Sequence, residues 1–281
     1  MIPLLGIGTC FLGESPEAAA IEKAAILRGL SLGMNLLDTA EMYGGGGSES
    51  LIGDMLRNRT ISRAEVIIVT KVCPQNASPP TLFKSCEASL KRLGTDYIDI
   101  YLLHWRDDCV SLPDTINGME ELVRRGDIRR WGVSNFDVRD MEDLFLAPEG
   151  MRCAVNQVLY HLGSRGIEYD LLPWLHSHGV TAMAYCPLAQ GGKLRRTAAD
   201  FHTNPALGAL AAKYKASIFQ IMLAFVLRNN DICAIPKAAN IAHIEENAAA
   251  PALAAAITAD EWAAIDVTYP PPAYKMHLDM D

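Results

Sequence analysis

Four residues that can hold or transfer a proton lie close to the ends of apolar segments. Asp38 ends the segment "MNLLD", Lys71 ends "VIIVTK", His104 follows "IDIYLL", and Tyr43 lies in the loop after Asp38. A tyrosine, with a pKa of about 10, is a poor proton donor at neutral pH, and a nearby ammonium group lowers that pKa. The pattern therefore indicates acid catalysis by Tyr43, assisted by Lys71.

Asp38 and His104 complete this set. A carboxylate beside Lys71 would offset the cost of burying the ammonium, and His104 would donate a hydrogen bond to a substrate oxygen. Such an arrangement suits the reduction of a carbonyl group when a hydride source is present. Taken singly, each residue also has an ordinary explanation: Asp38 as a turn cap, Lys71 as a surface amine and His104 as a core histidine.

Strand-like and helix-like segments alternate along the chain, as is typical of a parallel sheet with helices between its strands. Strands are predicted at residues 5–8, 34–38, 66–71, 98–103, 128–133, 154–158, 180–185 and 231–235. Helices are predicted at 16–32 with Ser15 as N-cap, and at 48–58, 79–93, 114–125, 137–146, 168–178, within 205–229 and at 240–249.

Eight such units in 281 residues predict an α/β fold, namely a single-domain (β/α)8 TIM barrel over residues 1–281. An open, doubly wound sheet is the alternative. Residues 266–281 include Pro270 to Pro272 and are predicted to be a tail over or beside the barrel. Barrel enzymes place their chemistry at the carboxyl ends of the strands, so Asp38, Lys71 and His104 should meet at one rim.

The composition limits the classes of partner and location. The formal charge of −8, from 25 Lys plus Arg against 33 Asp plus Glu, argues against nucleic acid or an anionic membrane as partner. The sequence shows no signal-peptide pattern and no long apolar run, so a cytoplasmic protein is predicted. The seven cysteines form no C-x-x-C pair, and no metal site is predicted.

The glycine run 44–47 first suggests phosphate binding, because backbone N–H groups can approach an anion closely where no Cβ is present. Neither known pattern is complete, however. Gly47 is followed by Ser48 and Glu49 rather than by the Lys and Ser or Thr of a Walker loop, and Glu49 replaces the third glycine of a dinucleotide motif. A flexible turn before helix 48–58 is the simpler interpretation.

Seven motifs in order resemble those of the aldo-keto reductases, and most closely those of small bacterial members that reduce methylglyoxal and similar aldehydes. They are "LDTAEMYG" (37–44), "TK" (70–71), "LLHW" (102–105), "GVSNF" (132–136), "NQVLY" (156–160), "YCPLAQGG" (185–192) and "IPKAANIAHIEEN" (235–247). The resemblance extends from about residue 4 to about residue 265, so it covers nearly the whole chain.

The resemblance implies a TIM barrel that binds NADPH across its rim and reduces a small carbonyl compound, with Tyr43 as general acid, Lys71 and Asp38 tuning it, and His104 orienting the carbonyl. Ser134, Asn135 and Gln157 would hold the carboxamide, and Tyr185 would stack on the nicotinamide. The remaining implied cofactor residues are Gly8, Thr9, Cys10, Asp38, Pro187, Leu188, Gln190, Ile235, Pro236, Lys237, Ala238, Asn240, His243, Glu246 and Asn247. The implied substrate pocket consists of Cys10, Tyr43, His104 and Trp105.

Four positions depart from the family pattern. Many members have Trp where Cys10 stands, which predicts a less aromatic pocket. Ala238 cannot donate a hydrogen bond to a phosphate, and His243 is a weaker, pH-dependent cation than the Arg of many relatives, so use of NADH beside NADPH is possible. The glycine run is also longer than usual, which predicts a looser loop around Tyr43.

Two other functions fit the same residues. Lys71 could act as the nucleophile of a Schiff-base aldolase, although a paired carboxylate argues against a neutral amine. A catalytically quiet nucleotide-binding protein of the same fold is the second alternative. The carbonyl substrate depends on loops near 105–113 and 186–204 and on the tail, and the chain is expected to be a monomer.

Overall fold

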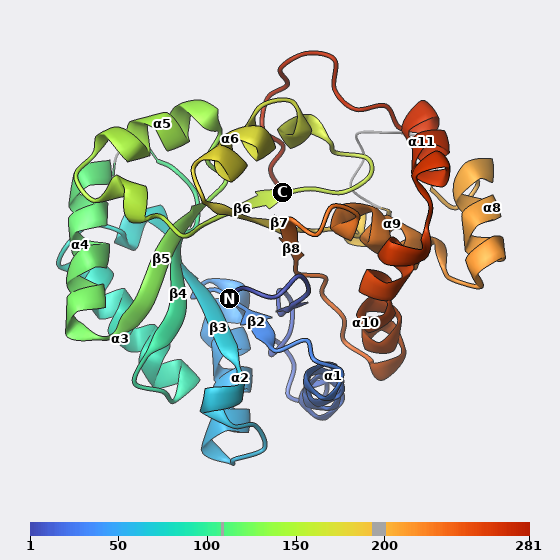
Figure 1. The fold of residues 1–281 in the computed structure, drawn as a ribbon. Helices are drawn as coiled ribbons and strands as arrows, with labels where there is room; N and C mark the ends of the chain where they lie inside the picture. The colour runs from blue at the N-terminus through green and yellow to red at the C-terminus, as the bar shows by residue number, and fades with distance from the viewer. Residues whose placement is uncertain (108–109, 193–200) are drawn as a thin grey trace.

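The computed structural model describes residues 1–107, 110–192 and 201–281. Within them, eight parallel strands follow one another around a single curled sheet in the order of the chain (Figure 1). The strands are β1 (Ile7–Gly8), β2 (Leu36–Asp38), β3 (Ile67–Val72), β4 (Ile98–Leu103), β5 (Ile128–Ser134), β6 (Val155–Leu159), β7 (Thr181–Tyr185) and β8 (Ile232–Ala234). The predicted (β/α)8 barrel is confirmed.

The barrel closes where the first strand meets the last. Gly6 N donates to Ala234 O at 2.9 Å, and Gly8 N donates to Pro236 O at 3.1 Å. A side chain on Gly8 would not fit, because a Cβ there would lie 2.7 Å from Ile235 O. The close approach of the two backbones therefore requires glycine at this position.

Helices surround the sheet (Figure 1). They are α1 (Ala19–Ser31), α2 (Gly47–Arg57), α3 (Thr81–Leu93), α4 (Leu112–Arg125), α5 (Val138–Leu146), α6 (Leu171–Ser177), α7 (Ala189–Gly192), α8 (Pro205–Tyr214), α9 (Ile218–Leu227), α10 (Ile241–Ala256) and α11 (Ala259–Thr268). Short 3-10 turns lie at η1 (Tyr43–Gly46), η2 (Arg63–Glu65), η3 (Pro74–Asn76), η4 (Gly150–Arg152) and η5 (Gly166–Glu168).

Two predicted helix boundaries are wrong. The first helix begins at Ala19 and not at 16, and Ser15 does not cap it, because its hydroxyl donates instead to the Glu17 carboxylate at 2.6 Å. The helix predicted at 240–249 continues through Pro251 to residue 256. A further helix, α11, then begins at the capping residue Thr258, so the segment predicted as a tail is helical until Thr268.

Side chains from alternate positions of the strands fill the inside of the barrel. Along β2, Leu36 points inward and Leu37 faces the helices, and along β3 Val69 points inward. Successive residues of a strand face opposite sides, so Asp38 and Lys71 follow these apolar residues on the inner face. The inner core consists of Leu36, Val69, Ile100, Leu102, Val155, Met183, Cys233 and Ile235. It forms an apolar floor beneath the polar rim.

The segment after α11 passes back over the barrel and ends near β6 and β7 (Figure 1). Lys275 Nζ lies 2.9 Å from Asp170 Oδ2, and Ser164 donates a hydrogen bond to Asp279. At its end, the Asp281 carboxylate accepts a hydrogen bond from Gln190. The tail therefore reaches the loop that follows β7.

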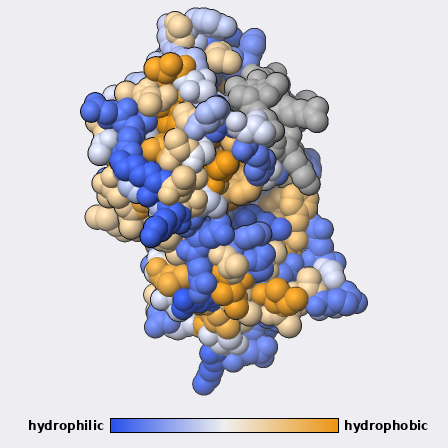
Figure 2. All heavy atoms as spheres, turned by 90° about the vertical axis from the view of Figure 1, so that its right-hand side faces the viewer, coloured by the Kyte–Doolittle hydropathy of each residue, from blue (hydrophilic) through white to orange (hydrophobic). Residues whose placement is uncertain are grey.

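On the face drawn in Figure 2, apolar residues lie in small groups among polar ones. Across the described ranges, no single helix is long and apolar enough to cross a bilayer; one pair bent by 93°, α8 with α9, has the required length and composition. In the same ranges, no three His, Cys, Asp or Glu side chains cluster in a way that could hold a metal ion.

Candidate active site

Lys71 and Asp38 form a buried ion pair at the rim. The side chain of Lys71 is fully buried, and Asp38 is 2% exposed. Lys71 Nζ donates to Asp38 Oδ2 at 2.8 Å, to Thr39 O at 2.7 Å and to the Tyr43 hydroxyl at 3.2 Å. An ammonium group has three N–H donors, so each of them has an acceptor. This arrangement holds a cationic lysine rather than a neutral amine.

Gln157 fixes the other side of Asp38. Its Nε2 donates to Asp38 Oδ1 at 2.7 Å, reaching across the barrel from β6. Burial raises the pKa of Asp38, while the Lys71 ammonium and the Gln157 amide oppose that rise. Both oxygens of the carboxylate are therefore held in place, and the carboxylate in turn holds Lys71.

Tyr43 enters the site from the short turn η1. Gly44, Gly45 and Gly46, which follow it, have φ values of 55°, 60° and 92°. These left-handed conformations are adopted readily only by glycine, so the run serves a defined turn and is not merely a flexible linker. The turn reverses the chain into α2, where Glu49 accepts hydrogen bonds from Thr70 and Arg92, both at 2.6 Å.

The pKa of Tyr43 differs from the sequence-based expectation. Burial raises the pKa of the phenol well above its usual value, and the nearby Asp38 charge raises it further. The direction is opposite to the lowering predicted from Lys71, because burial removes hydration that the phenolate needs. The phenol is consequently fully protonated at neutral pH, which is the form that a proton donor needs.

His104 faces Tyr43 across the site. The two rings are 5.9 Å apart in an edge-to-face arrangement, and the adjacent Trp105 ring lies 5.1 Å from the His104 ring. Burial and the Lys71 charge lower the pKa of His104 to about 3, so the imidazole is neutral. Its Nδ1 is buried and has no hydrogen-bond partner among the described residues.

Ser134, Asn135 and Tyr185 form a chain of hydrogen bonds along the rim. The Tyr185 hydroxyl donates to Asn135 Oδ1 at 2.8 Å, and Asn135 Nδ2 donates to His104 O at 3.2 Å. Ser134 Oγ donates to Gln157 O at 2.8 Å. The motif residues from β5, β6 and β7 therefore meet at one place, as their order in the sequence predicts.

Cys10 and Thr9 lie at the end of β1. Thr9 is fully buried and donates to Asp38 O at 2.8 Å, so it supports β2 rather than facing an open space. Cys10 is half-buried, and its burial raises the pKa of the thiol. The Cys10 thiol is consequently neutral, and it forms a weakly polar part of the wall beside Lys71 and Asp38.

The segments after β7 and β8 form the outer part of the rim. Pro187 is buried, Leu188 is half-buried, and Gln190 is exposed with a left-handed φ of 49°. Beyond β8, Ile235, Pro236 and Ala238 are buried, whereas Lys237 between the last two is exposed. No salt bridge to Lys237 is present in the described structure, so its ammonium is available to an anion.

The start of α10 lies next to Lys237. Asn240 caps this helix by accepting from His243 N at 2.9 Å, and His243 is exposed. Glu246 accepts from Ser217 at 2.9 Å, and Asn247 is 5% exposed with no partner for its Nδ2 in the described part of the chain. A helix N-terminus, a free ammonium and an unpartnered buried amide suit a phosphorylated nucleotide.

Sequence reasoning missed Thr39 and Glu41. Thr39 contributes a backbone oxygen to Lys71, which leaves no trace in residue type. The Glu41 side chain accepts from Cys73 N at 2.8 Å and from Asn76 Nδ2 at 3.0 Å. Its position two residues before Tyr43 in "AEMYG" was the available signal. Among the regions expected to choose the substrate, residues 108–109 and 193–200 lie outside the described residues.

These features define a (β/α)8 barrel in which titratable side chains gather at the carboxyl ends of the strands. Residues 4–269 match the Aldo/keto reductase family. The chain belongs to this family, so the predicted family is confirmed. It is 46% identical over 279 residues to the methylglyoxal reductase YeaE of Escherichia coli, covering 99% of this chain and 95% of that protein. It is 32% identical to a glyoxal reductase of Bacillus subtilis, covering 88% and 82% of the two chains.

Solved structures agree with this assignment. A crystal structure of an aldo/keto reductase from Klebsiella pneumoniae in complex with NADP and acetate matches with a TM-score of 0.94 and 46% identity, covering 100% of this chain and 96% of that one. A Klebsiella pneumoniae aldo-keto reductase in complex with NADPH matches with the same TM-score and identity, covering 100% and 95%.

Proposed function

We propose that this protein reduces small aldehydes and ketones of the methylglyoxal type to alcohols, with NADPH as the hydride source. The observation that carries the proposal is the contact of 3.2 Å between Lys71 Nζ and the Tyr43 hydroxyl, with Asp38 holding the ammonium from behind. The related methylglyoxal and glyoxal reductases support the substrate class. The relatives crystallised with NADP and NADPH support the cofactor.

In this proposal Tyr43 supplies the proton. When bound, NADPH would provide the hydride for the carbonyl carbon. The Tyr43 phenol donates its proton to the carbonyl oxygen, and the Lys71 ammonium stabilises the phenolate that remains. Asp38 keeps the ammonium in place, and the phenolate regains its proton from solvent. The raised pKa of Tyr43 keeps the phenol protonated before the reaction but makes it a weak acid, so the Lys71 ammonium has to stabilise the phenolate as it forms.

His104 orients the carbonyl group. Its low pKa makes it a neutral hydrogen-bond donor and not a competing acid. We place its proton on Nε2, because a proton on the buried Nδ1 would have no acceptor within the described structure. The Nε2–H group then points a fixed dipole at the substrate oxygen. Trp105, whose ring lies beside that of His104, and Cys10 would contribute to the wall of the substrate pocket.

The rim residues would hold the cofactor. Ser134, Asn135 and Gln157 supply hydrogen-bonding groups for a carboxamide, and Tyr185 supplies an aromatic face. Residues from Pro187 to Gln190 would follow the pyrophosphate. Lys237, with the N-terminus of α10, would bind the 2′-phosphate that distinguishes NADPH from NADH. The wall of the cofactor site would include Gly8, Thr9 and residues 235–238. Asn247 would offer its side-chain amide to the adenine end of the cofactor.

The two alternative functions make different demands on Lys71. A Schiff-base aldolase needs a neutral amine, whereas the three acceptors around Lys71 Nζ favour the ammonium. Borohydride treatment in the presence of a carbonyl compound would trap an adduct on an aldolase, and we expect none. A nucleotide-binding protein without turnover would bind NADPH and leave every aldehyde unchanged.

The test is a panel of small aldehydes and ketones, each assayed with NADPH and with NADH by the loss of nicotinamide absorbance. We expect turnover of dicarbonyls and other small aldehydes, with NADPH preferred. Cofactor binding without turnover of any member of the panel would contradict the proposal and favour the quiet nucleotide-binding protein. The monomeric state and the cytoplasmic location predicted from the sequence stay predictions; light scattering tests the former.

A further inference from the structure

Glu41 connects the loop that carries Tyr43 to the strand that carries Lys71. Its backbone N donates to Lys71 O at 3.2 Å. Its side-chain Oε1 accepts from Cys73 N at 2.8 Å, and thus satisfies the first backbone donor after β3. The same oxygen accepts from Asn76 Nδ2 at 3.0 Å. One residue therefore joins the two segments through both its backbone and its side chain.

The segments on the two sides of Tyr43 differ in how they hold the loop. Met42, just before the tyrosine, is 50% exposed. After it come glycines: a Cβ at Gly45 would meet nothing within 4 Å, whereas Gly44 and Gly46 pack closely against the side chains of Glu14 and Arg92. The glycines have no side chains that could bond to β3. In the segment before Tyr43, the Glu41 side chain makes hydrogen bonds to Cys73 and Asn76.

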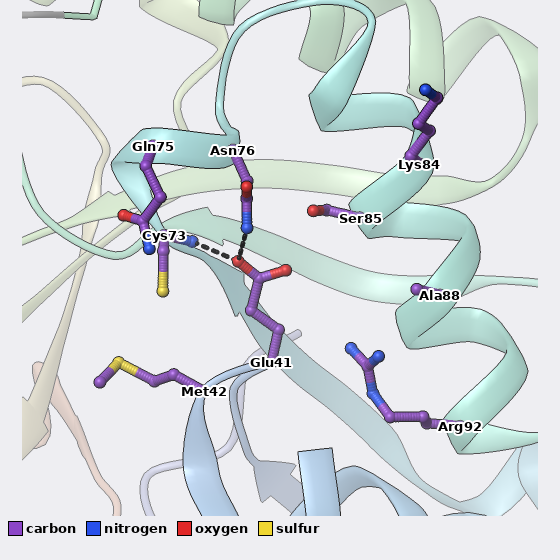
Figure 3. A pocket seen from close by; sticks show the side chains of 9 residues that line it. All are labelled: Glu41, Met42, Cys73, Gln75, Asn76, Lys84, Ser85, Ala88 and Arg92. Carbon is purple, nitrogen blue, oxygen red and sulfur yellow. Dashed lines mark hydrogen bonds between the residues drawn. The ribbon is translucent and has the colours of Figure 1, made fainter. Parts of the chain in front are cut away.

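Figure 3 shows Glu41 beside a surface cavity of about 430 Å³ between the loop, η3 and α3. The carboxylate points toward Cys73 and Asn76, while Ser85 lies across the cavity on α3. Glu41 is half-buried at the wall of this cavity and does not belong to the apolar core. Replacing it therefore removes the bridge without opening a hole in the core.

We propose that Glu41 is a positioning residue for proton transfer, whose carboxylate bridges the Tyr43 loop to the end of β3 and so fixes the distance between the Tyr43 phenol and the Lys71 ammonium. The inference rests on the proposed function, because it concerns Tyr43 as the proton donor. Glu41 itself touches neither of these two groups through its side chain. Its effect is expected in the rate of turnover, not in the binding of the cofactor.

The first experiment compares three variants of the full chain. Glu41→Ala removes the bridge, Glu41→Gln keeps an oxygen that can accept from Cys73 N, and Ser85→Ala alters the opposite wall of the same cavity. We expect Glu41→Ala to lower kcat by on the order of a hundredfold, as a small misplacement of a reacting group does. Glu41→Gln should retain kcat within about threefold, and the dissociation constant for NADPH should stay within about threefold in all variants.

A double-mutant cycle separates positioning from a purely structural role. If Glu41 acts through Tyr43, adding Glu41→Ala to Tyr43→Phe should cause no further loss, because no phenol remains to be positioned. Equal losses from Glu41→Ala in the presence and absence of the phenol would overturn the inference, as would a kcat for Glu41→Ala equal to that of the unaltered enzyme. Glu41→Asp, whose carboxylate falls short of Cys73 N, replaces Glu41→Ala under the same criteria if the alanine variant does not fold.

The cycle also keeps this inference apart from the proposed function. Unchanged turnover in Tyr43→Phe alone would contradict the proposed function. A large loss in Tyr43→Phe combined with full activity in Glu41→Ala would contradict only the role of Glu41.

Discussion

The Nζ atom of Lys71 lies 3.2 Å from the hydroxyl oxygen of Tyr43, inside a site where that lysine is fully buried. In the proposed function, this contact joins the proton donor to the charge that stabilises its conjugate base. Burial alone would make Tyr43 a very weak acid. The ammonium matters most during the reaction, when negative charge develops on the phenol oxygen.

Removing Lys71 should affect stability as well as activity. In Lys71→Met, the Asp38 carboxylate stays buried without its counter-ion, so the free energy of unfolding should fall by about 3–5 kcal/mol. Urea denaturation measures this change. The double variant Lys71→Met with Asp38→Asn should recover much of the stability while remaining inactive. A double variant as unstable as the single one would contradict this account of the pair.

Acid should destabilise the protein through buried histidines. The pKa of His104 is lowered to about 3 and that of His161 to about 4, both mainly by burial. In the unfolded chain, the pKa of each histidine is about 6.5. The unfolded chain therefore binds more protons below that pH, so stability is complete above pH 6.5 and is lost as the pH falls toward 4. Each histidine contributes a slope of at most about 1.4 kcal/mol per pH unit in this window.

His161→Asn tests this pH dependence away from the catalytic residues. Between about pH 6 and pH 4.5, the slope of the free energy of unfolding against pH should become shallower. The decrease should be at most about 1.4 kcal/mol per pH unit, which corresponds to one proton. Urea midpoints at several pH values measure it, with the exposed His176→Asn as the matched control. An unchanged slope in His161→Asn would show that this histidine is not held neutral.

The preference for NADPH should respond to residue 243. His243 is exposed at the start of α10, close in sequence to the exposed Lys237. In His243→Arg a permanently charged, fork-shaped donor replaces the imidazole, so the KM for NADPH should fall by about threefold to tenfold. The KM for NADH, which lacks the 2′-phosphate, should change little. A similar fall for both cofactors would place residue 243 away from the 2′-phosphate.

The sequence predicted well what depends on local pattern. Leu36 with Asp38 and Val69 with Lys71 alternate with outward-facing residues, and this period of two places the acid and the amine inside the barrel. Gly94 and Gly126 follow α3 and α4 in left-handed conformations, which glycine adopts readily at helix ends. The order of motifs was sufficient to bring β5, β6 and β7 residues to one rim.

What the sequence could not provide depends on three-dimensional surroundings. The pKa of Tyr43 was predicted in the wrong direction because desolvation depends on how many groups cover the phenol, which residue type does not reveal. Ser15 resembled a helix cap, but Glu17 takes its hydroxyl. Glu41 was overlooked because its partners, Cys73 N and Asn76, lie on a different strand and turn. The last predicted helix was ended at residue 249, yet α10 continues through Pro251 to Ala256.

The measurement that tests the central claim most directly is the turnover of methylglyoxal with NADPH by Tyr43→Phe, alongside NADPH binding by the same variant. The account predicts that kcat falls by on the order of a hundredfold to ten-thousandfold while NADPH binds within a few-fold of the unaltered protein. Turnover equal to that of the unaltered protein would contradict the assignment of Tyr43 as the proton donor.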